Sequence, residues 1–209
     1  MMTTSTSRAS SSSAIVPRFR FTTRADGDFA DTTRLPRGTT WLHQVHGATV
    51  VEVTGAGQHA GIDADAAFTT RPGCTLAVRT ADCVPVVLVN EAAIGVVHAG
   101  WRGLADGVIE ATVDAMGAPV EAHIGPHIRR GCYEFGADDL DRVASALGDH
   151  VRATTSWGAP ALDLTAGVRH ALRGVHLHDT GACTACSDVF FSWRAREERE
   201  RFATLAWLE

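Results

Sequence analysis

The chain has 209 residues and a net charge of −5 at pH 7, a length that suits one domain burying roughly 70% of the surface of the unfolded chain. The acidic balance, with a pI of about 6.0, argues against a nucleic-acid partner, because phosphate binding needs a basic patch. The 5 cysteines are an odd number with no secretory signal before them. We therefore expect free thiols in a reducing, cytoplasmic compartment.

Residues 1–17 are rich in serine and threonine and lack the hydrophobic segment of a secretory signal, so we predict a disordered tail. Residues 18–209 are then expected to form a single domain. No apolar run approaches the ~20 residues that a membrane span requires, which argues against a membrane partner. Nothing in the sequence indicates an oligomeric state.

Short apolar segments separated by polar and glycine-bearing loops predict strands in the first part of the chain. These strands are expected at residues 18–23, 41–45, 48–53, 66–70 and 74–79, with loops at 25–40 and 54–63. Later, helices are expected at 104–116, 138–147 and from an N-cap at Thr165 to Leu172, with strands at 120–124 and 175–178, a loop at 157–160 and a short extended segment at 162–164. This order predicts an α/β fold of the α+β sandwich type, with a mixed, largely antiparallel sheet and flanking helices.

The most informative stretch is residues 80–103, TADCVPVVLVNEAAIGVVHAGWRG. It holds two apolar runs, Val84 to Val89 and Ile94 to Val97, joined by a short turn-tolerant segment, which predicts a β-hairpin. A thiol, Cys83, lies at one end of the hairpin and an imidazole, His98, lies at the other. Thiolate and imidazole are both zinc ligands, so one metal ion could join the two side chains.

The register of the hairpin decides whether Cys83 and His98 meet. If Leu88 pairs with Ala93, Cys83 lies directly across from His98, with Cβ atoms about 4.5–5.5 Å apart. A slip of two residues keeps both side chains on one face as diagonal neighbours, whereas a slip of one separates them. The alternative interpretation is a small buried cysteine and a histidine that is an ordinary polar group at a strand end.

Polar residues near two predicted turns are further candidates for binding. Gln44 and His46 are expected to share a face at the end of the strand before Gly47, although His46 can equally be a polar residue at a hairpin end. After the hairpin, Arg102 lies in a glycine-flanked turn that leads into a helix. Backbone N–H groups at such a helix start, together with the arginine, can hold an anion.

Other chemistry-bearing residues are interpreted as structural. Asp63 and Asp65 are paired carboxylates of the kind that acid/base catalysis uses, but turn formation and backbone capping are the preferred interpretation. Cys183 and Cys186 form a C-x-x-C, half of a zinc knuckle without a second pair. We interpret these two as structural or incidental thiols and not as a dedicated metal or redox site.

Six motifs, in order, resemble those of one family. They are HQVHG at 43–47, TADCVPVVL at 80–88, VVHAGWRG at 96–103, IGPHI at 124–128, CYEFG at 132–136 and CTAC with FFSWR at 183–194. The resemblance is to the multicopper polyphenol oxidase (laccase-like) family, whose members are now regarded as purine nucleoside phosphorylases with adenosine deaminase activity. It implies an α/β sandwich and a metal centre whose catalytic ligands map to His46, Cys83 and His98.

The resemblance also implies a substrate and a cofactor. A nucleoside and phosphate are the expected partners, contacted by Arg24, Gln44 and Arg102. Ligand softness favours zinc (Zn2+) in a reducing cytosol, with copper as the other possible metal. Asp82 is either an acid/base group or a support for the ligand thiolate beside it. Expected substrates are adenosine and inosine, with guanosine and methylthioadenosine as further candidates.

Two departures from the family pattern leave other functions open. The short acidic loop at 25–40 replaces a glycine-rich segment, and Arg194 is followed by Ala195 where the family has paired arginines. The alternatives are a cysteine-dependent amide hydrolase acting on a cell-wall precursor, a copper-dependent phenol oxidase and a non-catalytic metal-binding protein. In the hydrolase, Cys83 would be a nucleophile activated by His98 without a metal.

Overall fold

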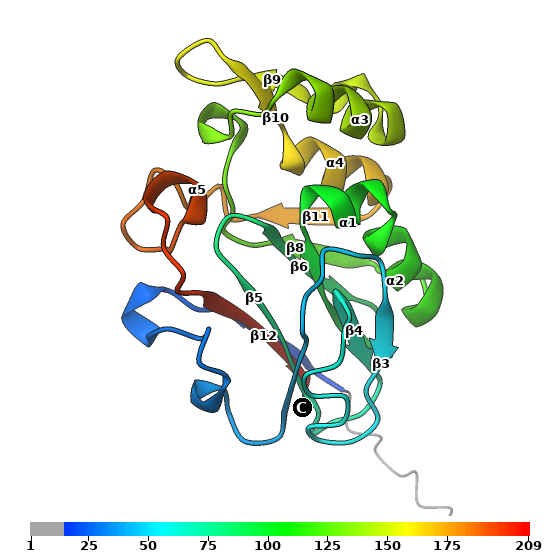
Figure 1. Cartoon of the computed structure of the whole chain (residues 1–209). Helices are drawn as coiled ribbons and strands as arrows, with labels where there is room; N and C mark the ends of the chain where they lie inside the picture. The colour runs from blue at the N-terminus through cyan, green and yellow to red at the C-terminus, as the bar shows by residue number, and fades with distance from the viewer. Residues whose placement is uncertain (1–14) are drawn as a thin grey trace, which may run out of the picture.

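The computed structural model describes residues 15–209, which form two facing β-sheets with helices on the outside of the larger one (Figure 1). The larger sheet has the strand order β11-β8-β6-β7-β4-β3 and the smaller one β1-β12-β5-β2. In chain order the strands of the larger sheet are β3 (Val50–Glu52), β4 (Ala66–Thr69), β6 (Val84–Val89), β7 (Ile94–Ala99), β8 (Glu121–Ile124) and β11 (His176–Asp179). Those of the smaller sheet are β1 (Pro17–Phe21), β2 (Thr39–Trp41), β5 (Thr75–Thr80) and β12 (Phe202–Leu208).

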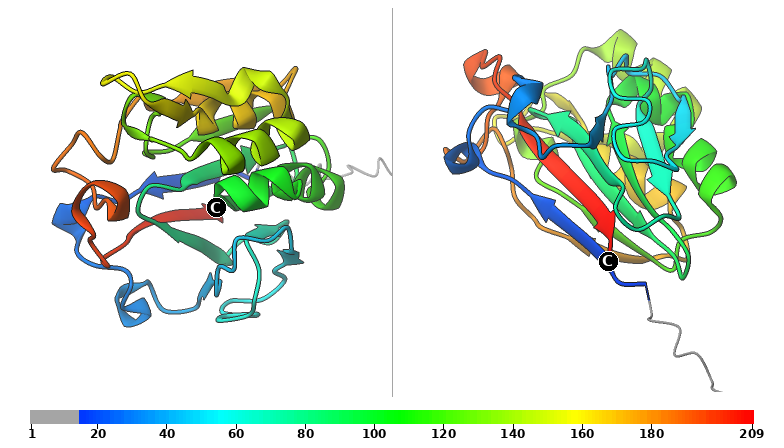
Figure 2. Two further views of the ribbon diagram at one scale, coloured as in Figure 1. Left: turned by 45° about the horizontal axis from the view of Figure 1, so that its top comes forward. Right: turned by 90° about the horizontal axis from the view of Figure 1, so that it is seen from below.

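The remaining elements are short. The helices are α1 (Trp101–Ala105), α2 (Val108–Met116), α3 (Ala137–Leu147), α4 (Leu164–Ala171) and α5 (Trp193–Arg196). A small antiparallel hairpin consists of β9 (Arg152–Thr154) and β10 (Pro160–Leu162), and 3-10 turns span Arg24–Asp26, Thr32–Arg34, Arg130–Cys132 and Asp149–Val151. Figure 2 shows α1 to α4 stacked over one face of the larger sheet, with the smaller sheet on the other side.

The core lies on both faces of the central hairpin. Every residue of β6 and β7 is buried, because alternate side chains point into two different layers. Val86 and Leu88 pack with the helices, whereas Val87 and Val96 pack against the smaller sheet. The strand pairs are antiparallel except β2–β5, β3–β4 and β8–β11. The predicted sandwich with a mixed, largely antiparallel sheet and flanking helices is therefore confirmed.

The register of the β6–β7 hairpin differs by two residues from the expected one. Val89 pairs with Ile94, so Pro85 and not Cys83 lies directly across from His98. The turn holds this register because the Asn90 side chain accepts hydrogen bonds from the backbone N–H groups of Ala92 and Ala93, a turn geometry that asparagine favours. Since the shift is even, Cys83 and His98 stay on one face as diagonal neighbours.

Local backbone geometry corrects several predicted boundaries. The strand expected at 41–45 is instead β2, which ends at Trp41, and His46 has a φ of 62°, outside strand geometry. The helix expected at 104–116 is two helices, α1 and α2, separated at Gly107, whose φ of 81° is left-handed. Asp163 rather than Thr165 caps α4, because its side chain accepts from the N–H of Ala166.

Two strand regions in the second half were not predicted. β12 is buried at most positions between β1 and β5, so it is the structural centre of the smaller sheet. The hairpin of β9 and β10 flanks the expected loop at 157–160. The expected tail at 1–17 falls mainly outside the described residues, and β1 begins at Pro17.

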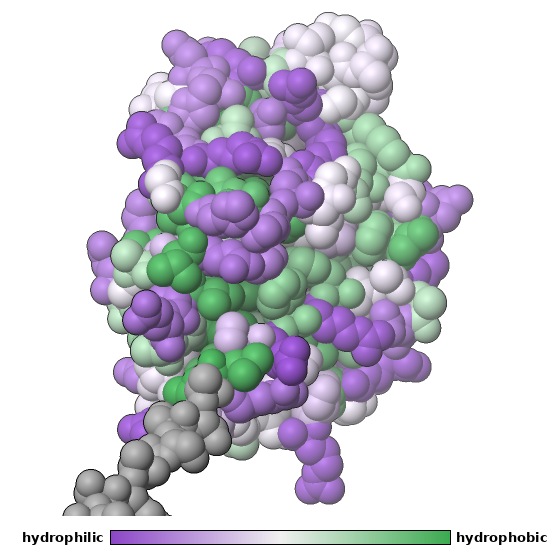
Figure 3. Space-filling view, turned by 180° about the vertical axis from the view of Figure 1, so that it is seen from behind, coloured by the Kyte–Doolittle hydropathy of each residue, from purple (hydrophilic) through white to green (hydrophobic). Residues whose placement is uncertain are grey.

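Large hydrophobic side chains on the surface are dispersed. Apart from the adjacent Ile15 and Val16, the exposed ones are separated along the chain, namely Val45, Ile62, Val120, Trp157, Val189 and Trp193. Figure 3 shows hydrophobic residues interspersed with hydrophilic ones on the back of the molecule. Among residues 15–209, none of the helices has the length and apolar character needed to cross a bilayer.

Candidate active site

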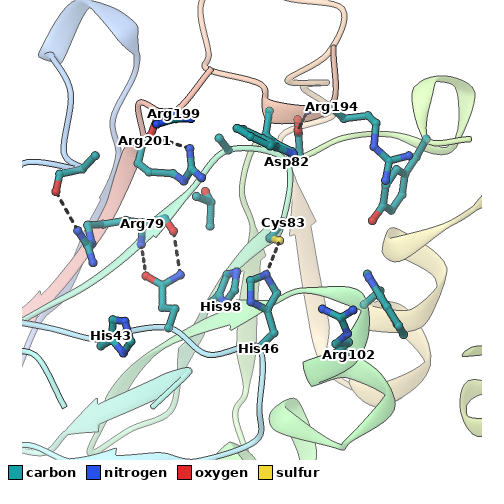
Figure 4. Close-up of a pocket in the computed structure, with 17 residues that line it drawn as sticks. His43, His46, Arg79, Asp82, Cys83, His98, Arg102, Arg194, Arg199 and Arg201 are labelled. Atoms are coloured by element: carbon teal, nitrogen blue, oxygen red, sulfur yellow. Dashed lines mark hydrogen bonds between the residues drawn. The ribbon is translucent and has the colours of Figure 1, made fainter. Parts of the chain in front are cut away.

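Three side chains predicted to be metal ligands meet in one place. His46 comes from the turn after β2, Cys83 from the residue before β6, and His98 from β7. One ligand atom from each lies within 4.8 Å of the other two. The Cys83 Sγ is 3.8 Å from His46 Nε2, and the two imidazole rings meet edge to face at 78° with centroids 4.8 Å apart. Figure 4 shows the three side chains converging on a cavity.

A buried carboxylate, Asp65, positions both histidines. Its oxygens accept hydrogen bonds from the backbone N–H groups of His46, at 3.0 Å, and Gly47, at 2.7 Å. The same carboxylate lies 2.7 Å from the Nδ1 atom of His98. The backbone contacts stabilise the left-handed conformation of His46, and the ring contact directs the Nε2 atom of His98 away from Asp65. The interpretation of Asp65 as a backbone cap is therefore confirmed, with a second contact that the sequence did not indicate.

Cys83 and His98 are electrostatically coupled. Burial raises the pKa of the Cys83 thiol, but the charge of His98 and the hydrogen bond with His46 outweigh burial and lower it to about 6. Burial lowers the pKa of His98, but Cys83 and Asp65 more than reverse this and raise it to about 9. A thiolate next to an imidazolium is thus the favoured state when no metal is bound.

The side chains of His46, Cys83 and His98 are suited to bind a metal ion. The Nδ1 atom of His98 is engaged by Asp65, which leaves Nε2 as the ligand atom, an arrangement typical of metal-binding histidines. Gly100 lies beside the cluster, and a Cβ atom there would be 2.7 Å from His46 Cδ2 and 3.3 Å from Cys83 Sγ. Two imidazoles and one thiolate are a ligand set found in catalytic zinc sites, which keep a further position open.

The cluster opens into a cavity of about 590 Å³ that five arginines line. These are Arg79, Arg102, Arg194, Arg199 and Arg201. Asp82 is the only carboxylate among the lining residues. In Figure 4, Arg79, Arg199 and Arg201 lie to one side of Cys83, with Arg102 and the guanidinium of Arg194 to the other.

The charges of these arginines are not neutralised by ion pairs within residues 15–209. Arg79, Arg194 and Arg201 donate only to backbone carbonyl oxygens, such as that of Glu134, which lies 2.6 Å from Arg194. Burial and the charge of Arg201 lower the pKa of Arg79. The Arg102 guanidinium lies over the Trp101 ring at 4.6 Å and is exposed to the cavity. A cavity with this charge is suited to a multiply charged anion.

Aromatic side chains complete the lining. Trp101, Tyr133 and Trp193 all face the cavity, and their flat surfaces suit a planar ring. Burial raises the pKa of the Tyr133 hydroxyl well above its usual value, so that it stays protonated and able to donate a hydrogen bond.

The polar groups of the other two predicted contact residues, Gln44 and Arg24, are engaged by protein atoms. Gln44 lines the cavity, but its side-chain amide both donates to and accepts from the backbone of Arg79, at 2.8 Å in each case. Arg24 does not line the cavity, and it is held by Glu198 at 2.6 Å with its guanidinium over the Phe191 ring. The helix α1 has only 5 residues, which is too short for its N-terminus to bind an anion by itself. Arg102 is therefore the group in this turn that would bind an anion.

Asp82 is a structural neighbour of the thiol. One carboxylate oxygen accepts from the hydroxyls of Thr184, at 2.6 Å, and Ser192, at 2.7 Å, and the other accepts from the backbone N–H of Arg194. Its φ of 95° is unusual for a residue other than glycine. These contacts support a positioning role for Asp82 over an acid/base role.

The sequence of this chain is similar to that of one known protein family over most of its length. Residues 23–209 match the family described as multi-copper polyphenol oxidoreductase laccase. The chain belongs to this family. It is 40% identical over 187 residues to a Streptomyces griseus protein named purine nucleoside phosphorylase, covering 83% of this chain and 76% of that protein. A Pseudomonas aeruginosa protein with the same name is 35% identical over 85% of this chain and 77% of the relative.

Solved structures share the fold. A Neisseria meningitidis protein described as a DUF152 family member superposes with a TM-score of 0.75 and 33% identity, over 85% of this chain and 77% of that chain. A Bacillus licheniformis hypothetical protein named YfiH superposes with a TM-score of 0.74 and 26% identity, over 86% of this chain and 78% of that chain. Family membership, expected from the six motifs, is therefore confirmed.

The sequence did not reveal most of the arginines in the cavity. Arg79 is at the end of β5, whereas Arg199 and Arg201 precede β12, a strand that was not predicted. Their convergence depends on the pairing of β12 with β5, where Phe202 lies opposite Thr80. The dense arginine and glutamate run at 194–201 was the available signal, although its alternating charges resemble an ordinary solvated segment.

Proposed function

We propose that this chain is a metal-dependent purine nucleoside phosphorylase that acts on adenosine and inosine and also deaminates adenosine. Guanosine and methylthioadenosine are included as further substrates. The observation that carries the proposal is one cavity that joins the His46, Cys83 and His98 cluster to five arginines without carboxylate partners among the described residues. The names of the bacterial relatives support the phosphorylase reaction.

Phosphorolysis needs an anion held near the sugar. In this reaction the bond between C1′ of the ribose and N9 of the base breaks, a bond from C1′ to a phosphate oxygen forms, and the base leaves with a proton. Arg102 and Arg199 are exposed, and neither side chain is hydrogen-bonded within residues 15–209, so they can contact phosphate directly. Arg79, Arg194 and Arg201 would add positive potential from fixed positions.

The other lining residues suit the nucleoside. Trp193 is exposed and offers a ring face for a purine, and stacking of this kind contributes about 1–3 kcal/mol per base. The protonated Tyr133 hydroxyl can donate a hydrogen bond to a ring nitrogen or carbonyl. Gln44 keeps its amide on the Arg79 backbone, so its contribution would be to hold the cavity wall in place.

A metal ion would be held by His46, Cys83 and His98, with zinc preferred and copper as the other candidate. Bound there, it would supply Lewis-acid polarisation of a substrate atom and activation of water for attack at C6 of adenosine. The residues around it have separate tasks. Asp65 keeps the Nδ1 proton on His98, and Gly100 leaves space beside the thiol.

One observation favours a second candidate, the cysteine-dependent amide hydrolase. The lowered pKa of Cys83 and the raised pKa of His98 also describe a nucleophilic thiolate with its imidazolium. The two functions differ in their need for metal. Hydrolysis of an amide by a metal-free protein would favour this candidate, whereas nucleoside cleavage that requires metal would exclude it.

The test is an incubation of the purified protein with adenosine and inosine, with and without phosphate. We expect phosphate-dependent release of adenine and hypoxanthine, some conversion of adenosine to inosine, and loss of both activities in His98→Ala. Oxygen consumption with a phenol that scales with copper loading, without nucleoside cleavage, would identify a phenol oxidase instead. A metal-loaded protein inert toward all these substrates would identify a non-catalytic metal-binding protein.

A further inference from the structure

A second cluster of metal-ligating side chains lies outside the cavity, where Cys132 meets Cys183 and Cys186. Cys132 ends the 3-10 turn Arg130–Cys132, and the other two lie in the loop that links β11 to α5 (Figure 1). The three sulfur atoms all lie within 4.8 Å of one another, with Cys132 Sγ and Cys186 Sγ 2.8 Å apart. All three cysteines are free.

The backbone around the C-x-x-C turn is fixed by contacts with another part of the chain. Cys183 forms a β-bridge with His127, and the N–H of Thr184 donates to the His127 carbonyl at 3.1 Å. The N–H of Arg129 points at the Cys183 sulfur at 3.4 Å. This contact and the β-bridge fix the position of the Cys183 sulfur atom.

An arginine secures the other side of the turn. The Arg196 guanidinium donates to the carbonyl oxygens of Ala185 and Thr184, at 3.2 Å each, and pairs with the Glu198 carboxylate at 3.0 Å, so it fixes the loop between the two cysteines. A surface cavity lined by Cys132, Glu134 and Ala185, among others, leaves room for a fourth ligand from solvent.

We propose that Cys132, Cys183 and Cys186 form a second metal site, for a thiophilic ion such as Zn2+. Three thiolates at this spacing are a soft donor set that selects zinc or copper(I) over magnesium or calcium. The two residues of the C-x-x-C supply half of a zinc knuckle, and Cys132, which is distant in sequence, supplies the third ligand. Binding releases the thiol protons to solvent and leaves the oxidation state of sulfur and metal unchanged.

The site would have a structural role that links two parts of the molecule. Thr184 lies between the two loop cysteines, is buried, and donates its hydroxyl to Asp82 next to Cys83. A metal at the three thiols would therefore hold this loop, and with it Thr184, against the segment that carries the Cys83 ligand. This inference is independent of the proposed reaction.

The test compares the zinc content of the wild type and two variants of the full-length protein, all purified under reducing conditions. We expect two equivalents of zinc in the wild type and one equivalent in Cys186→Ser, the most exposed of the three ligands. Cys74→Ala, which removes a buried cysteine outside both clusters, should keep both equivalents. Zinc content in Cys186→Ser equal to that of the wild type would overturn the proposal.

The wild type also provides a measurement that does not depend on a variant folding. Titration with Cd2+ should produce sulfur-to-metal charge-transfer absorption, and an alkylating reagent should then leave Cys132, Cys183 and Cys186 unmodified. Alkylation of these three thiols at the metal-free rate would refute the site, as would a Cys132–Cys186 disulfide in the reduced preparation. Loss of one equivalent in Cys83→Ser reports on the active-site metal separately, so the two proposals fail independently.

Discussion

His98 Nδ1 lies 2.7 Å from a carboxylate oxygen of Asp65, and both side chains are buried. The contact fixes the ring orientation and the tautomer of His98, so the other nitrogen faces Cys83. Asp65 also accepts hydrogen bonds from the backbone N–H groups of His46 and Gly47. It therefore orients His98 directly and positions His46 by holding the loop that carries it. This relationship makes Asp65 a sensitive point for testing the metal centre.

Asp65→Asn should weaken metal binding by about 10- to 100-fold, the usual cost of removing a carboxylate partner of a ligating histidine. The amide keeps one acceptor oxygen but loses the charge that supports His98. A competition titration against a chromophoric chelator measures the change. The matched control is Asp63→Asn, because Asp63 makes a similar 2.6 Å contact with His43 on the surface. Equal affinity in the Asp65 and Asp63 variants would contradict the prediction.

Cys83→Ser should lose one equivalent of bound metal. A serine hydroxyl is a harder and weaker ligand than a thiolate for zinc or copper, and the thiol has a pKa of about 6, which favours its ligating form near neutral pH. Elemental analysis of the purified variant gives the answer, with Cys74→Ala as the control. Undiminished metal content would remove Cys83 from the ligand set.

Arg102→Ala should lower kcat/KM for phosphorolysis by about 10- to 100-fold, because a hydrogen bond to a charged group contributes about 1.5–3 kcal/mol. The side chain is exposed, and its main protein contact is the face of Trp101. The free energy of unfolding should therefore change by less than about 1 kcal/mol. Arg142→Ala, on the exposed face of α3, is the control. A large loss of stability with normal specific activity would show a structural role.

The central hairpin illustrates what the sequence could predict. The period of two and the even spacing were enough to place Cys83 and His98 on one face, although the register was wrong by two residues. The error came from the turn, because Asn90 places it one residue further along the chain than the expected pairing of Leu88 with Ala93 implied. A register shift of two residues keeps side chains on the same face. Cys83 and His98 therefore still meet, although they do not lie directly opposite each other.

The arginine cavity illustrates the limit of such prediction. Arg79 and Arg201 are far apart in the chain, and they line the same cavity because β12 inserts between β1 and β5. No local pattern records a long-range strand pairing, since propensity and periodicity describe neighbours along the chain. The same holds for Cys132, whose closeness to Cys183 and Cys186 depends on the bridge between His127 and Cys183.

Stability should fall between pH 6.5 and 4 because of His127. Burial, with the charge of Arg129, lowers the pKa of this histidine to about 4, against about 6.5 in an unfolded chain. Between these values the unfolded chain binds a proton that the folded protein excludes. The contribution of neutral His127 to the free energy of unfolding is therefore complete above pH 6.5 and is lost as the pH falls to about 4. The total loss is about 3 kcal/mol.

Urea unfolding at pH 7.5 and pH 5 tests this. His127 Nδ1 donates to the Gly125 carbonyl and Nε2 accepts from Thr165, so the ring is held in its neutral form. His127→Gln should show a smaller difference in unfolding free energy between the two pH values than the wild type. His176→Gln, which removes an exposed histidine, should retain the wild-type difference. An unchanged pH dependence in His127→Gln would assign the acid sensitivity to other groups.

Gly100→Ala should abolish tight metal binding while preserving the fold. The backbone at Gly100, with φ −74° and ψ 166°, is accessible to alanine, so the substitution adds no backbone strain. The new Cβ would lie 2.7 Å from His46 Cδ2 and 3.3 Å from Cys83 Sγ, and one of the two ligands must therefore move. Metal content and thermal unfolding of the same sample measure both consequences. Gly55→Ala, where a Cβ meets nothing within 4 Å, is the control. Full metal occupancy in Gly100→Ala would show that His46 has freedom to move without leaving the ion, and that the close approach at Gly100 is not what sets the ligand geometry.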